Sequence, residues 1–269
     1  MAWRGLTKQQ WDAIRVHLPP PKASTRGGRP RVDDRRCVEG VLWILWTGAQ
    51  WRALPRRYSS TSTCWRRLKA WEETGVLLKR WRAFLAQLND QQKLRWDECF
   101  ADGSFVPAKQ GVPRSVRPSG ARVRSGWFWS MARVLRWVQS LDAASPAEVT
   151  LLEKTLDTVA VGRPGKPGRP RKRPKRLIAD RGYDSNRLRA RLARRGIEPI
   201  IPARANHQRA THQDGRKLRR YRRRWIVERT FAWLGHVRRL VVRYERLITV
   251  YAGFFHLACA LLTLRKVLK

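Results

Sequence analysis

Acidic residues are scarce in this sequence. The chain has 20 Asp and Glu against 59 Lys and Arg in 269 residues, which gives a formal net charge of +39. An enzyme that acts on small neutral substrates does not need such a strong positive charge. A protein that binds a polyanion does need it, and the commonest polyanionic partner is nucleic acid. General overuse of arginine in a GC-rich genome is the alternative explanation. The 14 tryptophans and 42% apolar residues exclude a disordered basic tail.

Cysteines are few and scattered, which argues against a fold held by disulfides or by zinc. The four cysteines form no C-x-x-C pair, and the five histidines do not join them at zinc-finger spacing. We therefore expect neither a disulfide framework nor a structural zinc ion.

Long apolar runs are missing as well. The most apolar segment, Phe254–Leu264, is too short to cross a bilayer. Trp3, Lys8 and Trp11 interrupt any apolar run of a signal peptide. These absences predict no membrane partner and a cytoplasmic protein, which its positive charge would associate with the bacterial nucleoid.

Residues 1–95 predict a small all-helical region. Thr7 is expected to cap a first helix that ends before Pro19, and apolar stripes predict further helices over 35–47, 62–74 and 76–88. Short amphipathic helices with arginines between aromatic residues suit a helix-turn-helix-like DNA-binding module. Their tryptophan stripes are more typical of a core than of base-stacking platforms.

Two basic segments lie outside the predicted helices and strands. Gly28-Arg29-Pro30-Arg31 is similar to the core of an AT-hook, which lays arginines along a narrow minor groove. Arg29 and Arg31 are therefore candidate DNA-binding residues, although a plain basic linker explains them equally well. The Pro/Gly-rich loop of residues 162–176 is either a connector or a DNA-contacting arm.

Residues 96–269 predict a mixed α/β region. Two short apolar runs, at 99–106 and 176–184, each carry an aspartate followed closely by glycine. Both are typical of buried strands that deliver a carboxylate at or near their end. These two aspartates are Asp102 and Asp180.

The segment 217–240 carries a third acid. Its apolar residues recur at spacings of three to five and predict a helix. Tyr221, Arg224 and Glu228 are spaced three and four apart, so a helix places all three on one face. A surface ion pair between Arg224 and Glu228, worth roughly a few tenths of a kcal/mol, is the simplest explanation of that spacing.

Two strand-borne aspartates and one helix-borne glutamate form the ligand set that two-metal phosphoryl transfer requires. Hard oxygen ligands hold two Mg²⁺ or Mn²⁺ ions roughly 3.5–4 Å apart, one at the attacking hydroxyl and one at the leaving oxygen. The spacing of these acids is weakly specific, because any globular chain contains three.

Five stretches of the sequence resemble insertion-sequence DDE transposases of the IS4/IS5 type, and they extend through nearly the whole chain. They are W-I-L-W-T-G-A-Q-W-R-A-L-P (43–55), A-D-G-S-F-V-P-A-K (101–109), L-I-A-D-R-G-Y-D (177–184), Y-R-R-R-W-I-V-E-R-T-F-A-W-L (221–234) and F-F-H-L-A-C-A-L-L-T-L (254–264).

The resemblance implies catalytic roles and partners. It implies that Asp102, Asp180 and Glu228 are the catalytic acids and bind two Mg²⁺ or Mn²⁺ ions. The implied substrate is double-stranded DNA, both the terminal repeats of the element and the target, and a homo-oligomer forms the synaptic complex. The implied fold is RNase H-like, a mixed sheet with helices on both sides and the acids converging at one edge. This domain would span residues 96–269, after the helical region of residues 1–95.

The signature around Glu228 matches the family except at one position. Tyr221, Arg224 and Glu228 fit the pattern Tyr-x2-Arg-x3-Glu. The lysine that follows in the family is replaced by Gly235, so Arg238 or Arg239 is expected to stand in for it. Tyr221, Arg224, Arg238 and Arg239 are therefore candidate DNA-binding residues.

Residues 111–138 depart from the family. The segment is rich in Arg and Trp and lacks the Asp-Gly turn that joins two strands there in relatives. Back-translation of Gly126–Val138 in another reading frame permits a strand–turn–strand sequence. We hypothesise that compensating frameshifts replaced the segment, which resequencing beside sister copies would test. The sheet would then lose the strands beside Asp102, which would leave its edges unpaired or filled by a poor substitute, and stability and strand transfer would fall. The alternative is that Trp127–Val138 still forms a strand pair.

The sequence thus predicts an enzyme that cleaves DNA and joins 3′-OH ends to target DNA. The competing interpretation is a catalytically defective relic that acts only as a sequence-specific DNA-binding protein.

Overall fold

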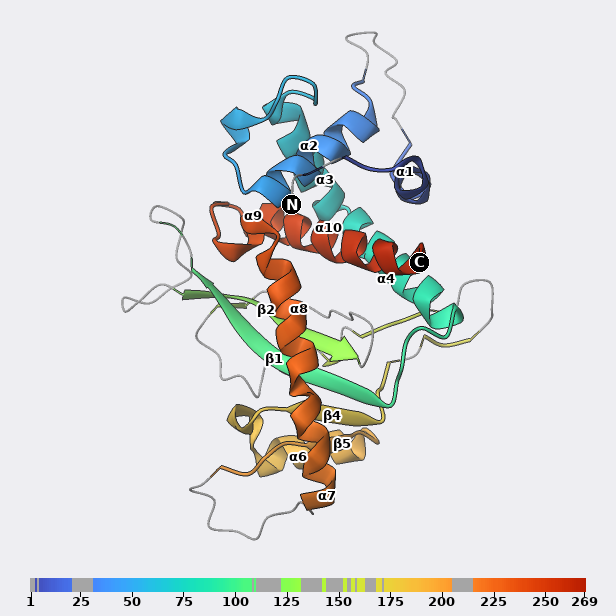
Figure 1. Ribbon diagram of the computed structural model, residues 1–269, viewed down its shortest axis with the longest axis vertical. Helices are drawn as coiled ribbons and strands as arrows, with labels where there is room; N and C mark the ends of the chain where they lie inside the picture. Colours follow the sequence, from blue (N-terminus) through green and yellow to red (C-terminus); the bar gives the residue numbers. More distant parts are fainter. Residues whose placement is uncertain are drawn as a thin grey trace. The chain divides into compact units, whose positions relative to one another are not determined.

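The computed structural model describes most of the chain (Figure 1). The described residues are 3, 5–20, 31–107, 109, 122–131, 142–143, 152–153, 156–157, 159–162, 168–170, 172–204 and 215–269, with the backbone alone at 103–105, 122–131 and 142–143. The chain divides into two compact units, which are described separately. The first comprises residues 1–81, 109–112 and 234–268, and the second comprises residues 82–108, 113–233 and 269.

The first unit is helical. Its elements are α1 (Lys8–Arg15), α2 (Asp34–Thr47), the short 3₁₀ helix η1 (Trp51–Ala53), α3 (Thr61–Glu73), the start of α4 (Val76–Asp90), α9 (Arg238–Val241) and α10 (Ile248–Val267). Local capping explains where several of these helices begin and end. The side chain of Thr7 accepts a hydrogen bond from Gln10 N, which accounts for the start of α1 as predicted. Gly48, at a φ of 72°, ends α2 in the left-handed region.

The helix α10 belongs to this first unit and not to the second unit, which contains the sheet. Gly253 allows it to approach α3 closely, because a Cβ at this position would lie 2.9 Å from Leu68 Cδ1. Nearby, His256 Nδ1 lies 2.9 Å from each carboxylate oxygen of Glu72. The contacts therefore join the N-terminal helices to residues 234–268. The functional division into residues 1–95 and 96–269 stays a prediction.

The length of α10 corrects the expectation based on Phe254–Leu264. Residues 248–253 extend the apolar segment, so that α10 is long and apolar enough to cross a membrane by length and composition alone. In the most apolar window of this helix, 67% of the residues are buried inside the protein. A buried core helix shows the same combination of length, composition and burial.

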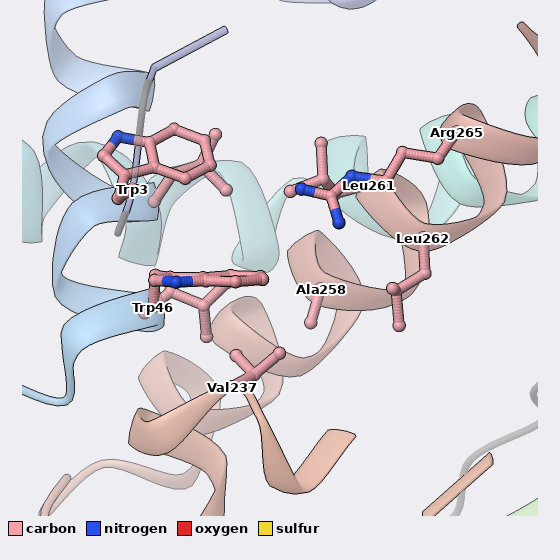
Figure 2. Close-up of a pocket in the computed structure, with 9 residues that line it drawn as sticks. Trp3, Trp46, Val237, Ala258, Leu261, Leu262 and Arg265 are labelled. Atoms are coloured by element: carbon pink, nitrogen blue, oxygen red, sulfur yellow. The ribbon is translucent and has the colours of Figure 1, made fainter. Parts of the chain in front are cut away.

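An apolar pocket lies where the start of the chain meets α2 and α10 (Figure 2). The rings of Trp3 and Trp46 have their centroids 6.3 Å apart, and Arg265 Cζ lies 5.5 Å from the ring centroid of Trp46. Burial lowers the pKa of Arg265. Arg265 thus lines the pocket with its guanidinium near the Trp46 ring (Figure 2).

The second unit contains a five-stranded mixed sheet in the order β3-β2-β1-β4-β5. Its elements are β1 (Glu98–Pro107), β2 (Arg122–Met131), β3 (Asp142–Ala143), β4 (Arg176–Ala179), η2 (Arg181–Tyr183), α6 (Asn186–Arg194), β5 (Glu198–Ile200), α7 (Gly215–Leu218), η3 (Arg219–Arg224) and most of α8 (Trp225–Gly235). The strands β1, β4 and β5 are parallel, and β2 is antiparallel to β1 and to β3. This arrangement confirms the predicted mixture of a sheet with helices.

The strand β2 occupies the position beside the Asp102 strand, so this edge of β1 is paired and not open. Residues 122–131 pair with β1 along its length, from Cys99↔Met131 to Pro107↔Arg122. A ladder is made by backbone groups, so even an arginine- and tryptophan-rich segment can form it. The frameshift hypothesis stays a prediction, and residues 132–138 lie outside the described part of the chain.

The predicted helix over 217–240 is divided into four pieces. The chain runs through α7, the 3₁₀ helix η3, α8 and α9. Apolar spacing cannot distinguish an α-helix from a 3₁₀ helix over one or two turns, which is why the sequence predicts a single helix. In the 3₁₀ segment, residues three apart are eclipsed, so Tyr221 and Arg224 lie on the same side.

Candidate active site

The two predicted strand aspartates come together because their strands are adjacent, parallel and in register. Ala101 of β1 pairs with Ala179 of β4, so Asp102 and Asp180 occupy the next position on neighbouring strands. The register of β1 against β2 shifts between Gly103 and Ser104, immediately after Asp102. Bulges of this kind bend a strand and redirect its side chains.

Side chains on one face of the sheet form three rows across β1, β4 and β5. The residues in register are Glu98, Arg176 and Glu198 in the first row, and Phe100, Ile178 and Ile200 in the second. Alternation along the strands then places Asp102 and Asp180 in the third row. The apolar middle row packs with Ile226 and Val227 of α8, so this helix covers the face on which the two aspartates lie.

The opposite face of the sheet is also covered. Cys99, Ala101, Leu177 and Ala179 occupy the alternate positions and are all buried. Burial on both faces explains why these two strands appear in the sequence as continuous apolar runs.

Asp180 is held by the turn that follows its strand. It is the N-cap of η2, and its Oδ1 accepts a hydrogen bond from Gly182 N. Its other oxygen, Oδ2, lies 3.5 Å from Arg224 Nη1. The backbone thus fixes one carboxylate oxygen of Asp180, while the other oxygen faces the guanidinium of Arg224.

Arg224 bridges the two aspartates. Its Nη2 donates to Asp102 Oδ2 at 2.9 Å, and its Nη1 donates to the Tyr221 hydroxyl at 3.1 Å. Burial alone would lower the pKa of Arg224, but the hydrogen bond and charge of Asp102 outweigh it, and the pKa is raised. Arg224 therefore stays protonated, and its single positive charge lies between the two carboxylates.

Glu228 lies apart from this cluster. It is in the first turn of α8, and its side chain is exposed. Among the described residues it makes no hydrogen bond or ion pair, and no three His, Cys, Asp or Glu side chains there come close enough together to hold a metal ion. The structure thus joins Asp102 to Asp180 through Arg224, and the alternative of an Arg224–Glu228 ion pair is not observed.

The donor chemistry of the two aspartates fits a divalent cation. Two carboxylates on adjacent strands offer hard oxygen ligands of the kind that Mg²⁺ and Mn²⁺ prefer. The cation that they share in this structure is the guanidinium of Arg224. This arrangement indicates that the pair requires positive charge between its members.

The predicted DNA-binding arginines differ in their surroundings. Arg238 is exposed, whereas Arg239 is buried and donates to Glu245 and to the carbonyl of Ala49. Of these two, Arg238 has the side chain that can reach a phosphate. Arg31 is exposed and pairs with Asp34 at 3.0 Å, and Arg29 lies outside the described residues.

Glu98, a buried acid in the first row, was not predicted from the sequence as a site residue. Its Oε1 accepts from Arg220 Nη1 at 2.6 Å and from Arg223 Nη2. The available signal was the spacing of four residues between Glu98 and Asp102, which places both on one face of a strand.

Comparison with known proteins gives two matches to family models. Residues 6–81 match "Putative transposase of IS4/5 family", and residues 134–263 match "Transposase DDE domain". Residues 82–133, which include Asp102, lie between these two ranges.

Individual relatives are similar over part of the chain. A "Putative transposase for insertion sequence element IS402" of Burkholderia cepacia is 44% identical over 129 residues, which are 47% of this chain and 57% of that protein. An uncharacterized 16.2 kDa protein of the same element is 35% identical over 102 residues, 36% of this chain and 69% of that protein. A "Putative transposase for insertion sequence element IS6501" of Brucella ovis is 35% identical over 89 residues, 33% of this chain and 67% of that protein.

Proposed function

Because the chain belongs to the IS4/5 family of transposases, we propose that it cleaves DNA at the ends of an insertion sequence and joins the 3′-OH ends to target DNA. One observation supports this proposal most directly. Asp102 and Asp180 are in register on adjacent strands, and Arg224 contacts both of them. The mixed sheet with both faces covered supports an RNase H-like domain for this unit.

Asp102, Asp180 and Glu228 would hold two Mg²⁺ or Mn²⁺ ions. When bound, the ions would supply activation of the attacking oxygen and stabilisation of the leaving oxygen. The role of the carboxylates would be to hold these cations in place, because carboxylates themselves repel the phosphate of the substrate. Arg224 and Tyr221 lie beside them, where a guanidinium and a hydroxyl can bind phosphate oxygens.

The high positive charge of the chain supports DNA as the proposed partner. With a formal net charge of +39, the chain would neutralise many phosphates and release their counterions, so DNA binding should weaken steeply with salt. Within this proposal, residues 1–95 would recognise the terminal repeats, a homo-oligomer would pair two ends, and the protein would act at the nucleoid in the cytoplasm.

The proposal is tested by cleavage of DNA that carries the repeats flanking the gene. We expect the full chain to nick this DNA at the element ends with MgCl₂ or MnCl₂ and to leave it intact with EDTA. DNA of scrambled end sequence is the control. Binding to the repeats without cleavage in either metal would contradict the proposal and favour the non-enzymatic relic.

Arg224→Ala should make the stability of the fold sensitive to divalent cations. Removing the guanidinium leaves two facing carboxylates, which should lower the free energy of unfolding in EDTA by about 2 kcal/mol, because the site is only partly exposed. Mg²⁺ or Mn²⁺ should then raise the midpoint of thermal unfolding more in the variant than in the wild type, since a ligand of the native state stabilises it.

The matched control is Arg222→Ala, in the same 3₁₀ turn and exposed to solvent. Its midpoint should respond to cations as the wild type does. Equal responses of Arg224→Ala and the wild type would show that the ions do not bind between Asp102 and Asp180.

A further inference from the structure

Glu98 begins the strand that carries Asp102, and its carboxylate is almost fully buried. The residue is 3% exposed, and two arginines of η3, Arg220 and Arg223, donate to its Oε1. Its Oε2 is buried without a hydrogen-bond partner among the described residues. A buried carboxylate with one unpaired oxygen is an expensive way to stabilise a fold, because desolvation offsets most of the attraction of the pair.

The same 3₁₀ turn contacts β1 at a second point. Arg224 donates to Asp102, which is four residues after Glu98 on the same face of the strand. Phe100 lies between these two acids and packs with Ile226 and Val227 just beyond the turn. The turn is therefore bound to β1 on both sides of an apolar contact.

The position of Arg224 follows from these contacts. A 3₁₀ turn is held by weaker backbone hydrogen bonds than an α-helix, and few exceed one or two turns. Its register along β1 therefore depends on its side chains. Arg220 and Arg223 fix that register at Glu98, and Arg224 then reaches across Asp102 and Asp180.

We propose that Glu98 is a positioning residue, which sets Tyr221 and Arg224 over the two aspartates by anchoring Arg220 and Arg223. The inference rests on the proposed function for its effect on DNA cleavage, but its effect on η3 is independent of activity. Glu98 contacts neither DNA nor a reacting atom in this role. Its removal should lower the rate of the chemical step and leave DNA affinity nearly unchanged, because the net charge of +39 offers many other phosphate contacts.

The test compares Glu98→Gln, Glu98→Asp and Glu198→Gln in the full chain. Glu198 lies in the same row as Glu98 but pairs with Arg176 and with Lys217 of α7, not with η3. Cleavage of end-bearing DNA should show kcat lowered roughly 10- to 100-fold in Glu98→Gln, as expected for misplaced groups, with KM changed by less than about twofold. Glu98→Asp, which keeps the charge, should recover part of kcat, and Glu198→Gln should keep kcat within about twofold of the wild type.

Hydrogen exchange gives a readout that does not require cleavage. The backbone amides of residues 219–224 should exchange faster in Glu98→Gln than in the wild type, while the amides of α10 should be unchanged. If Glu98→Gln does not fold, Glu98→Asp should still show faster exchange confined to these residues. Unchanged exchange in η3, or an equal loss of kcat in Glu198→Gln, would overturn the proposal. A wild-type chain that does not cleave DNA, but whose η3 loosens in Glu98→Gln, would contradict the proposed function alone.

Discussion

Replacing Asp102 with asparagine is expected to reduce metal-dependent DNA cleavage by about 10³-fold or more. A metal ion supplies several kcal/mol of charge stabilisation in the transition state, and each 1.36 kcal/mol corresponds to a factor of ten in rate. Asparagine keeps the volume and one acceptor oxygen, so Arg224 can still donate a hydrogen bond to it. The expected loss of cleavage rate is therefore caused by the missing negative charge and not by a change in side-chain shape.

The measurement is the single-turnover rate of end cleavage at saturating DNA. The matched control is Asp97→Asn, five residues earlier, where the carboxylate is 57% exposed and pairs with Lys175. That control should cleave at the wild-type rate. A variant of Asp102 that cleaves within about tenfold of the wild type would exclude this residue as a metal ligand.

The second large effect is expected in the first unit, at Glu245. Its Oε1 accepts from Arg239 Nε at 3.0 Å and from Trp51 Nε1 at 3.4 Å, and the side chains of Glu245 and Arg239 are 7% and 5% exposed. Glu245→Ala would leave the Arg239 guanidinium buried without its counter-charge. Breaking a buried pair in this way costs about 3–5 kcal/mol of folding free energy.

Urea unfolding of Glu245→Ala measures this loss directly. Glu73→Ala provides the exposed control, because Glu73 is 49% exposed and pairs with Lys69 four residues earlier on α3. It should lose roughly 0.5 kcal/mol or less. The double variant Glu245→Leu with Arg239→Met should regain much of the stability, because apolar side chains remove both buried charges. A loss below about 1 kcal/mol in Glu245→Ala would show that water reaches Arg239.

Local features of the fold could be predicted from the sequence. The cap at Thr7, the end of α2 at Gly48 and the strands that bear Asp102 and Asp180 each depend on a few neighbouring residues. The existence of two aspartates on buried strands was therefore predictable. Their adjacency was implied only by the family resemblance and not by the residues themselves, because the pairing of β1 with β4 joins residues that are far apart in the chain.

Other differences between the sequence predictions and the structure arise from burial and from competing contacts. Arg238 and Arg239 are equivalent in the sequence, but packing exposes one and buries the other beside Glu245. Arg224 lies four residues before Glu228, a favourable helical spacing, yet its guanidinium reaches Asp102 and Asp180 instead of Glu228. An ion pair predicted from helical spacing forms only when no better partner approaches from elsewhere in the fold.

The place of α10 in the first unit has a consequence for synthesis of the protein. Domains usually fold in the order in which they leave the ribosome. Here the helices α2 and α3 share their unit with α10, which is translated after every other helix and strand. Their apolar faces therefore stay uncovered on the nascent chain, whereas the sheet unit is already complete. A ribosome that stalls before residue 248 would thus release a polypeptide with an open N-terminal core, which is a substrate for chaperones and proteases.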